Sequence, residues 1–272
     1  MIKLIATDID GTLVKDSSAS LYPELLETVE ALVNQGMIFF AASGRQYYSI
    51  RNMFDSVADK IGYIAENGAH IRLGDKDLQV VAMEREHVVA IINQLRQYSD
   101  TCDMIISTTE GSLVESKNQD FLDLITYGYH NKFTQVEDVL AGNAPIIKIA
   151  IYRKGSIRDL GESVLIPAWK DKVKACMAGE EWVDFMDASV DKGNALTFIQ
   201  QYFDVTKEET MAFGDNGNDI GLMKAAGESY AVENAVEEVK EAAKHICPDY
   251  TKQGVCQVLK TVLQKKEDEW RN

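Results

Sequence analysis

The sequence has little cysteine, no run of basic residues and no long apolar segment. Its four cysteines, Cys102, Cys176, Cys247 and Cys256, lie far apart, and no CxxC pair or Cys/His cluster has the spacing of a zinc site. Neither a zinc site nor a disulfide framework is expected, so the simplest interpretation is free buried thiols in a reducing cytosol.

The charge balance argues against two classes of partner. Asp and Glu outnumber Lys and Arg 43 to 28, which gives a formal net charge of −15. A surface this acidic repels nucleic acid and anionic membranes, and an anionic ligand needs local positive groups to overcome the field. No apolar run approaches the roughly 18–20 residues that span a bilayer, and the N-terminus lacks the pattern of a signal peptide. We expect a cytoplasmic protein with no nucleic-acid or membrane partner.

The chain does contain enough apolar material for a core. Its 272 residues are 46% hydrophobic and 26% charged, which is ordinary for a globular protein. This length suggests about two domains, although one large α/β domain also fits. Residues 2–7, 37–43 and 61–69 have the pattern of buried strands, and residues 23–35 have apolar groups at helical spacing. This order predicts βαβ units and a parallel sheet.

The middle of the chain follows a different pattern. A helical pattern at 88–98 precedes short segments typical of strands, at 104–108, 112–116, 146–153, 173–178 and 181–186. The first pattern then resumes, with helices expected at 194–203, 218–227, 235–245 and 254–265 and strands at 210–216 and 229–232. This order predicts one α/β domain that is interrupted by an inserted α+β unit at roughly 84–187.

Polar signals follow four of the predicted strands: Asp8-Ile9-Asp10, Ser43-Gly44-Arg45, Glu66-Asn67-Gly68 and the run from Asp215 to Asp219. Parallel strands bring their carboxyl ends to one edge of a sheet, where open α/β sheets bind ligands. Carboxylates gathered there repel one another unless a cation lies among them, and Mg²⁺ takes oxygen ligands. Asp8 and Asp215 are natural metal ligands, and Asp10 can offer its backbone carbonyl.

These groups favour phosphoryl transfer. Aspartate is a covalent nucleophile for phosphoryl groups, and the reaction needs mainly positioning and charge neutralisation. Asp8 and Asp10 share one face of an extended chain, so one can attack while the other handles a proton. Gly11 permits the tight turn that follows.

Several groups could hold the phosphoryl oxygens. Lys192 supplies positive charge, Ser43 a hydroxyl donor, and Ile9, Asp10 and Gly44 backbone N–H donors. Each motif alone has a plainer interpretation: an Asp-Gly turn, a loop, a solvated lysine, or an Asx-turn or calcium-type loop at GDNGND. The last lacks the glutamate that completes an EF-hand. The order of the motifs, each closing a predicted strand, favours the catalytic interpretation.

Taken together, the motifs resemble those of a known family. Residues 8–12 (DIDGT), 43–45 (SGR), Lys192 and 214–219 (GDNGND) look like the four motifs of the haloacid dehalogenase superfamily. The segments 66–69 (ENGA), 192–196 (KGNAL) and 211–223 (MAFGDNGNDIGLM) are similar to its Cof-type phosphatase branch. The resemblance implies a Rossmann-like parallel-sheet core with helices on both faces, residues 1–83 and 188–272. It also implies that residues 84–187 form a large inserted α/β cap that governs substrate specificity.

The resemblance also implies roles for single residues. Asp8 would be the nucleophile that forms an aspartyl-phosphate, and Asp10 the general acid and then the base. Mg²⁺ would be the cofactor. The implied metal-site residues are Asp8, Asp10 through its carbonyl, Asp215 and Asp219, and the implied phosphate- and substrate-binding residues are Ile9, Ser43, Gly44, Arg45, Asn67, Lys192 and Asn218.

We therefore expect a Mg²⁺-dependent phosphatase of small phosphomonoesters, acting as a monomer or weak homo-oligomer. Sugar phosphates are the favoured class, and phosphorylated cofactors such as pyridoxal phosphate or FMN are also handled in this branch. A phosphotransferase or mutase using the same aspartyl-phosphate, and a non-catalytic sugar-phosphate sensor, are the alternatives. Two departures from the branch pattern, Glu233 and the segment 249–255 (DYTKQGV), bear on substrate choice.

Overall fold

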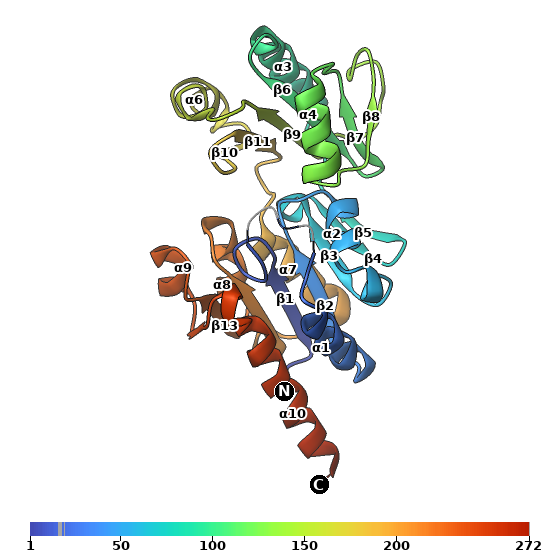
Figure 1. Ribbon diagram of the computed structural model, residues 1–272, viewed down its shortest axis with the longest axis vertical. Coiled ribbons are helices and arrows are strands. Elements are labelled where there is room, and N and C mark those ends of the chain that lie inside the picture. The colour runs from blue at the N-terminus through green and yellow to red at the C-terminus, as the bar shows by residue number, and fades with distance from the viewer. Residues whose placement is uncertain (16–17, 19, 272) are drawn as a thin grey trace. The chain divides into compact units, whose positions relative to one another are not determined.

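The computed structural model describes residues 1–15, 18 and 20–271, and the chain folds as two compact units (Figure 1). Unit 1 comprises Met1–Leu78 and Asp191–Asn272, and unit 2 comprises Gln79–Val190. Unit 2 is thus inserted into unit 1. The sequence pattern placed the inner boundaries at 83/84 and 187/188, a few residues from these positions.

Unit 1 is built on a sheet with eight strands among the described residues, in the order β14-β13-β12-β1-β2-β3-β4-β5. The strands from β14 to β3 pair in parallel, which puts β1 in the middle of the parallel part. Their bounds are β1 (Leu4–Asp8), β2 (Ile38–Ala42), β3 (Gly62–Ala65), β4 (His70–Leu73), β5 (Lys76–Val80), β12 (Thr210–Gly214), β13 (Glu228–Val232) and β14 (His245–Cys247).

Helices cover both faces of this sheet. The helices of unit 1 are α1 (Pro23–Asn34), α2 (Tyr47–Met53), α7 (Lys192–Phe203), α8 (Ile220–Ala225), α9 (Glu237–Ala242) and α10 (Gly254–Arg271). Helix α1 packs against α10 and α7 packs against α8, and α1 and α7 lie on opposite sides of strands β1 and β2 (Figure 1). Right-handed β-helix-β crossovers on either side of β1 produce this arrangement. The predicted α/β fold class is confirmed.

Two details of unit 1 were not predicted. Beside the parallel strands, β4 runs antiparallel to β3, and β5 follows it at the edge of the sheet. The helix expected at 235–245 ends at Ala242, and β14 follows it. These strands lack a buried apolar run: β5 is partly or fully exposed throughout, and β14 is an edge strand whose first two residues are exposed. The hydrophobic pattern therefore did not indicate them.

Unit 2 has a sheet of six strands among the described residues, in the order β10-β11-β9-β6-β7-β8. The strands are β6 (Asp103–Thr108), β7 (Gly111–Val114), β8 (Phe133–Gln135), β9 (Lys148–Tyr152), β10 (Lys174–Met177) and β11 (Trp182–Met186). The helices are α3 (Arg85–Leu95), α4 (Gln119–Asp123), α5 (Arg158–Leu160) and α6 (Ile166–Trp169). Val88 and Ile91 of α3 share an apolar cluster with Ile149 of β9, and Phe121 of α4 belongs to a second cluster with Tyr152. Unit 2 therefore has apolar packing of its own.

Two further expectations concern the whole chain. All four cysteines carry free thiols, and Cys176 alone is only half-buried. Among the described residues, no helix combines the length and the apolar character that crossing a membrane requires.

Candidate active site

The site is built at the carboxyl end of β1. All five residues of β1 are buried, and the strand pairs with β12 on one side and β2 on the other. Asp8 lies opposite Ala42, the last residue of β2, so Ser43 follows at the same edge. The strand order therefore brings the carboxyl ends of β12, β1 and β2 together, as the sequence predicted.

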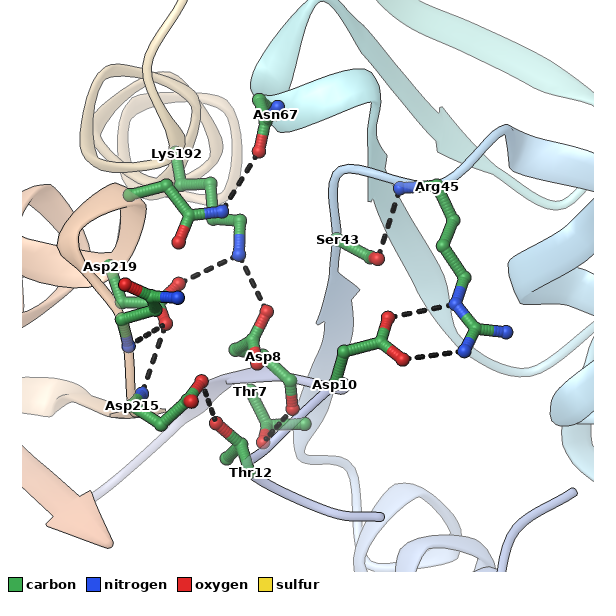
Figure 2. A network of polar contacts seen from close by, with 12 residues as sticks. Thr7, Asp8, Asp10, Thr12, Ser43, Arg45, Asn67, Lys192, Asp215 and Asp219 are labelled. Carbon is green, nitrogen blue, oxygen red and sulfur yellow. Dashed lines mark hydrogen bonds and ion pairs between the residues drawn. The ribbon is translucent and has the colours of Figure 1, made fainter. Parts of the chain in front are cut away.

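Lys192 is the buried cation between Asp8 and Asp219 (Figure 2). It is the first residue of α7, its side chain is fully buried, and its Nζ lies 2.6 Å from Asp8 Oδ1 and 2.7 Å from Asp219 Oδ1. Burial alone would lower the pKa of Lys192, but Asp219 and Asp8 together raise it above its ordinary value. The two carboxylates therefore favour the charged ammonium form of this buried side chain. The N-cap of α7 helps to place it, because Asp191 Oδ1 accepts a hydrogen bond of 2.7 Å from the Gly193 N–H.

Asp219 is held by donors on both carboxylate oxygens. Oδ1 faces Lys192, and Oδ2 accepts hydrogen bonds from the backbone N–H groups of Asp215 (3.0 Å) and Asn216 (3.2 Å). A Cβ on Gly214 would lie 2.5 Å from the Asp219 Cβ, so only glycine fits at the end of β12. Asp219 thus fixes the loop that presents Asp215.

Asp215 lies against the turn that follows β1. Thr12 Oγ1 donates a hydrogen bond of 3.1 Å to Asp215 Oδ1. A Cβ on Gly11 would lie 2.2 Å from Asp215 Oδ2, and Gly11 has a φ of +82°. Both the space and the backbone conformation therefore require glycine at this position. Burial and the nearby Asp219 raise the pKa of Asp215 to about 6.

These side chains have the donor set of a divalent-metal site. Oxygen atoms of Asp8, Asp215 and Asp219 lie within 4.8 Å of one another in the described part of the chain. Asp8 Oδ2 is buried and accepts no hydrogen bond from any described residue. Burial, and then Asp219, raise the pKa of Asp8 well above its ordinary value, although Lys192 opposes this. Because one ammonium offsets only one of these three carboxylates, a hard divalent cation fits the remaining negative charge.

Asp10 points to a different partner from Asp8 (Figure 2). Arg45 holds both of its carboxylate oxygens, with Nε 2.7 Å from Oδ2 and Nη2 2.5 Å from Oδ1. Such a bidentate pair fixes the plane and the direction of the carboxylate. Asp8 and Asp10, the two acids predicted to act together, are thus oriented by different basic residues. Lys192 contacts Asp8, and Arg45 contacts Asp10.

Hydrogen bonds connect the loops that follow β2 and β3. The Asn67 N–H donates to the Ser43 carbonyl (2.9 Å), and the Arg45 N–H donates to Ser43 Oγ (3.1 Å). Asn218 Nδ2 donates to Asn67 Oδ1 at 3.0 Å, which links this region to the Asp215 loop. A Cβ on Gly44 would meet the Asn67 side chain at 3.2 Å. The structure therefore brings these five predicted residues together, with Ile9 buried directly after Asp8.

Tyr47, two residues beyond Arg45, is 4% exposed and packs against Tyr63, with ring centroids 5.3 Å apart. The two departures from the family pattern pair with each other, because Lys252 Nζ lies 2.6 Å from Glu233 Oε2.

Sequence reasoning gave no role to three residues that shape the site: Thr12, Asp191 and Asn234. Thr12 closes the identified motif at 8–12 and Asp191 directly precedes Lys192, so their positions were usable signals. Asn234 donates a hydrogen bond of 2.7 Å from Nδ2 to the Gly11 carbonyl, across 223 positions of sequence. No local pattern could have indicated that contact.

Comparison with known proteins gives a consistent result. The family model described as haloacid dehalogenase-like hydrolase matches residues 5–259. The 5-amino-6-(5-phospho-D-ribitylamino)uracil phosphatase YbjI of Escherichia coli is 26% identical, with 97% of each chain covered. A crystal structure of a protein from Eubacterium rectale is 36% identical with a TM-score of 0.87, covering 96% of this chain and 99% of that one. The structure described as the HAD subclass IIB sugar phosphatase BT4131 is 25% identical with a TM-score of 0.80, covering 96% and 98%.

Proposed function

The chain belongs to the haloacid dehalogenase-like hydrolases, and we propose that it is a Mg²⁺-dependent phosphatase that hydrolyses small phosphomonoesters through an aspartyl-phosphate. The observation that carries the proposal is Asp8 Oδ2, a buried carboxylate oxygen without a donor, beside Lys192 and two further acids. A carboxylate oxygen kept free of donors at a strand end is suited to nucleophilic attack.

Asp8 and Asp215 would hold the metal ion with their carboxylates, and Asp10 with its backbone carbonyl. Asp219 would support this set, since its oxygens already face Lys192 and two backbone N–H groups. When bound, Mg²⁺ supplies positive charge that offsets the carboxylates and the phosphoryl oxygens.

The reaction follows from the two acids. Asp8 Oδ2 attacks phosphorus, the bond from phosphorus to the ester oxygen breaks, and the leaving oxygen takes a proton from Asp10. Asp10 then accepts a proton from water as that water attacks phosphorus, which releases inorganic phosphate and restores the Asp8 carboxylate. Arg45 occupies one lone-pair site on each oxygen of Asp10, so a second site on each oxygen stays open to the proton while Arg45 holds the carboxyl group. We assign Arg45 the task of orienting Asp10 between the two steps.

The remaining groups would hold the transferring phosphoryl group. Lys192 supplies a fixed positive charge, and the Ser43 hydroxyl with the N–H groups of Ile9 and Gly44 supplies hydrogen-bond donors. Asn218 and Asn67, which are hydrogen-bonded to each other, would approach the phosphate and the substrate.

We assign unit 2 the role of the cap that selects the substrate. The preferred substrates are small esters of sugars or polyols. This choice is supported by relatives named as phosphatases of a phosphoribitylamino-uracil and by a structure named as a sugar phosphatase.

The test is phosphate release from a panel of phosphomonoesters, with and without Mg²⁺. The panel includes hexose phosphates, 5-amino-6-(5-phospho-D-ribitylamino)uracil, FMN and pyridoxal phosphate. We expect release that needs Mg²⁺ and falls at least about 10³-fold in Asp8→Asn. The matched control is Asp59→Asn, an exposed acid paired with Arg51 on the surface of unit 1, which should retain full activity. Full activity in Asp8→Asn, or no activity of the wild type on any ester, would contradict the proposal.

A further inference from the structure

The segment that follows β13 touches both loops of the candidate metal site. Asn234 Nδ2 donates to the carbonyl of Gly11 at 2.7 Å, and the N–H of Val236 donates to the carbonyl of Asp215 at 2.9 Å. Two positions of one short segment therefore hold the turn after β1 and the loop after β12.

The position of the Gly11 carbonyl affects the proposed metal site. It lies one peptide unit beyond the Asp10 carbonyl, which is a proposed metal ligand. The Gly11 N–H already donates to the Val14 carbonyl at 2.8 Å, and the missing side chain lets the backbone approach the Asp215 carboxylate. A movement of the Gly11 carbonyl would therefore also shift the preceding peptide unit. That shift would move the Asp10 carbonyl relative to Asp215.

We propose that Asn234 is a positioning residue for metal binding, acting through the Gly11 carbonyl. The inference rests on the proposed function, in which the Asp10 carbonyl and the Asp8 and Asp215 carboxylates hold Mg²⁺. The Asn234 amide holds the turn at a fixed distance from the Asp215 loop, so that these oxygens are arranged before the ion arrives. Groups that orient metal ligands in this way commonly contribute about 10- to 100-fold to metal affinity.

The surroundings of Asn234 separate this role from a general role in stability. Asn234 is exposed, so its removal opens no cavity in the core. Its neighbour Glu233 lies in the same segment and pairs with Lys252 at 2.6 Å, with both side chains about half exposed. A substitution of Glu233 thus perturbs the same segment without touching Gly11 or Asp215.

The experiment measures Mn²⁺ binding to the full chain by electron paramagnetic resonance of the free ion, with Mn²⁺ as the probe in place of Mg²⁺. The unfolding temperature is measured with and without Mg²⁺ in parallel. The variants are Asn234→Ala, Asn234→Asp and the control Glu233→Gln. We expect Asn234→Ala to bind Mn²⁺ about tenfold or more weakly while its metal-free unfolding temperature stays close to that of the wild type. Asn234→Asp should bind as weakly, because a carboxylate cannot donate to the Gly11 carbonyl.

The possible outcomes distinguish a failure of this inference from a failure of the proposed function on which it rests. If Asn234→Ala and Asn234→Asp bind Mn²⁺ as the wild type does, the positioning role is wrong and the proposed function stands. If Glu233→Gln weakens binding as much as Asn234→Ala, the effect belongs to the segment and the role of the amide is wrong. If the wild type binds no Mn²⁺ and releases no phosphate, the proposed function and this inference are both overturned.

Discussion

At the scale of the residue, the site depends on how closely two loops approach each other. The turn at Gly11 comes so near to Asp215 that a single added carbon atom would overlap the carboxylate. Close approach of this kind lets oxygens from different strands converge on one point, and it leaves the site intolerant of larger side chains. Gly11 therefore offers a direct test of that geometry.

We expect Gly11→Ala to lose much more activity than the backbone strain of an alanine at this position would explain. Gly36 is the matched control, because its φ of +80° is close to the +82° of Gly11, whereas an added Cβ there would meet no atom within 4 Å. Both substitutions carry the cost of a left-handed alanine, about 1–3 kcal/mol. Gly11→Ala must also displace Asp215, and a displacement of about 1 Å can cost roughly 100-fold in rate.

The measurement is kcat/KM with the free energy of unfolding for both variants. Gly36→Ala should lose stability with little change in kcat/KM, and Gly11→Ala should lose both. Equal kcat/KM values in the two variants would show that the contact between Gly11 and Asp215 is not needed for the reaction.

Single residues also show what a sequence can and cannot reveal. Asp8, Asp215 and Lys192 were predictable as neighbours because each adjoins the end of a strand or the start of a helix. The partner of Asp10 was not predictable, since Arg45 was expected near the substrate. Arg45 lies within hydrogen-bonding distance of both Asp10 oxygens, and its contact with the substrate stays a prediction. Contacts between distant side chains depend on packing, which local patterns do not encode.

At the scale of the element, helix α7 carries the only lysine described above at the site, on its first residue. The carboxylate of Asp191 accepts hydrogen bonds from the N–H groups of Gly193 (2.7 Å) and Asn194 (3.4 Å). This cap sets where the helix begins, and so where the Lys192 backbone lies.

We expect Asp191→Ala to lower kcat as well as stability. The matched control is Asn118→Ala in unit 2, where Asn118 caps α4 by accepting a hydrogen bond of 3.2 Å from the Asp120 N–H. Each substitution should cost about 0.5–2 kcal/mol of unfolding free energy. Thermal unfolding and kcat are compared for both. A kcat that is equally unchanged in the two variants would mean that the cap of α7 does not position Lys192.

The helices and strands also mark the limit of sequence reasoning at this scale. The buried strands β1, β2 and β12 were predicted within one or two residues of their ends, because each is an apolar run that closes on a polar motif. Strands β4 and β5 were missed because β4 is short, with only its first two residues buried, and β5 has no buried residue. The Gly74-Asp75 pair between them is a usable hairpin signal that the hydrophobic pattern did not support. Hydrophobic periodicity and burial predict a helix or a strand only where at least one face of that element is apolar.

At the scale of the whole molecule, the insertion was visible because the pattern changes twice along the chain. Buried runs with helices give way to short alternating strands and then return. The structure assigns these regions to two compact units that contain separate apolar clusters. Charge is a second whole-chain property, and it bears on function because the proposed substrate is an anion.

A formal net charge of −15 should act on the two proposed ligands in opposite directions. It repels a phosphate ester and attracts a divalent cation, and salt screens both effects as the Debye length falls from about 30 Å at 10 mM to about 8 Å at 150 mM. We therefore expect added KCl to tighten the binding of inorganic phosphate at saturating Mn²⁺ and to weaken the binding of Mn²⁺ itself. Calorimetric titrations at the two salt concentrations measure both constants. Since a general effect of salt on folding would shift both in the same direction, opposite shifts would identify the net charge as the cause. Weaker phosphate binding at high salt would instead show that Lys192 and Arg45 dominate the field that the anion meets.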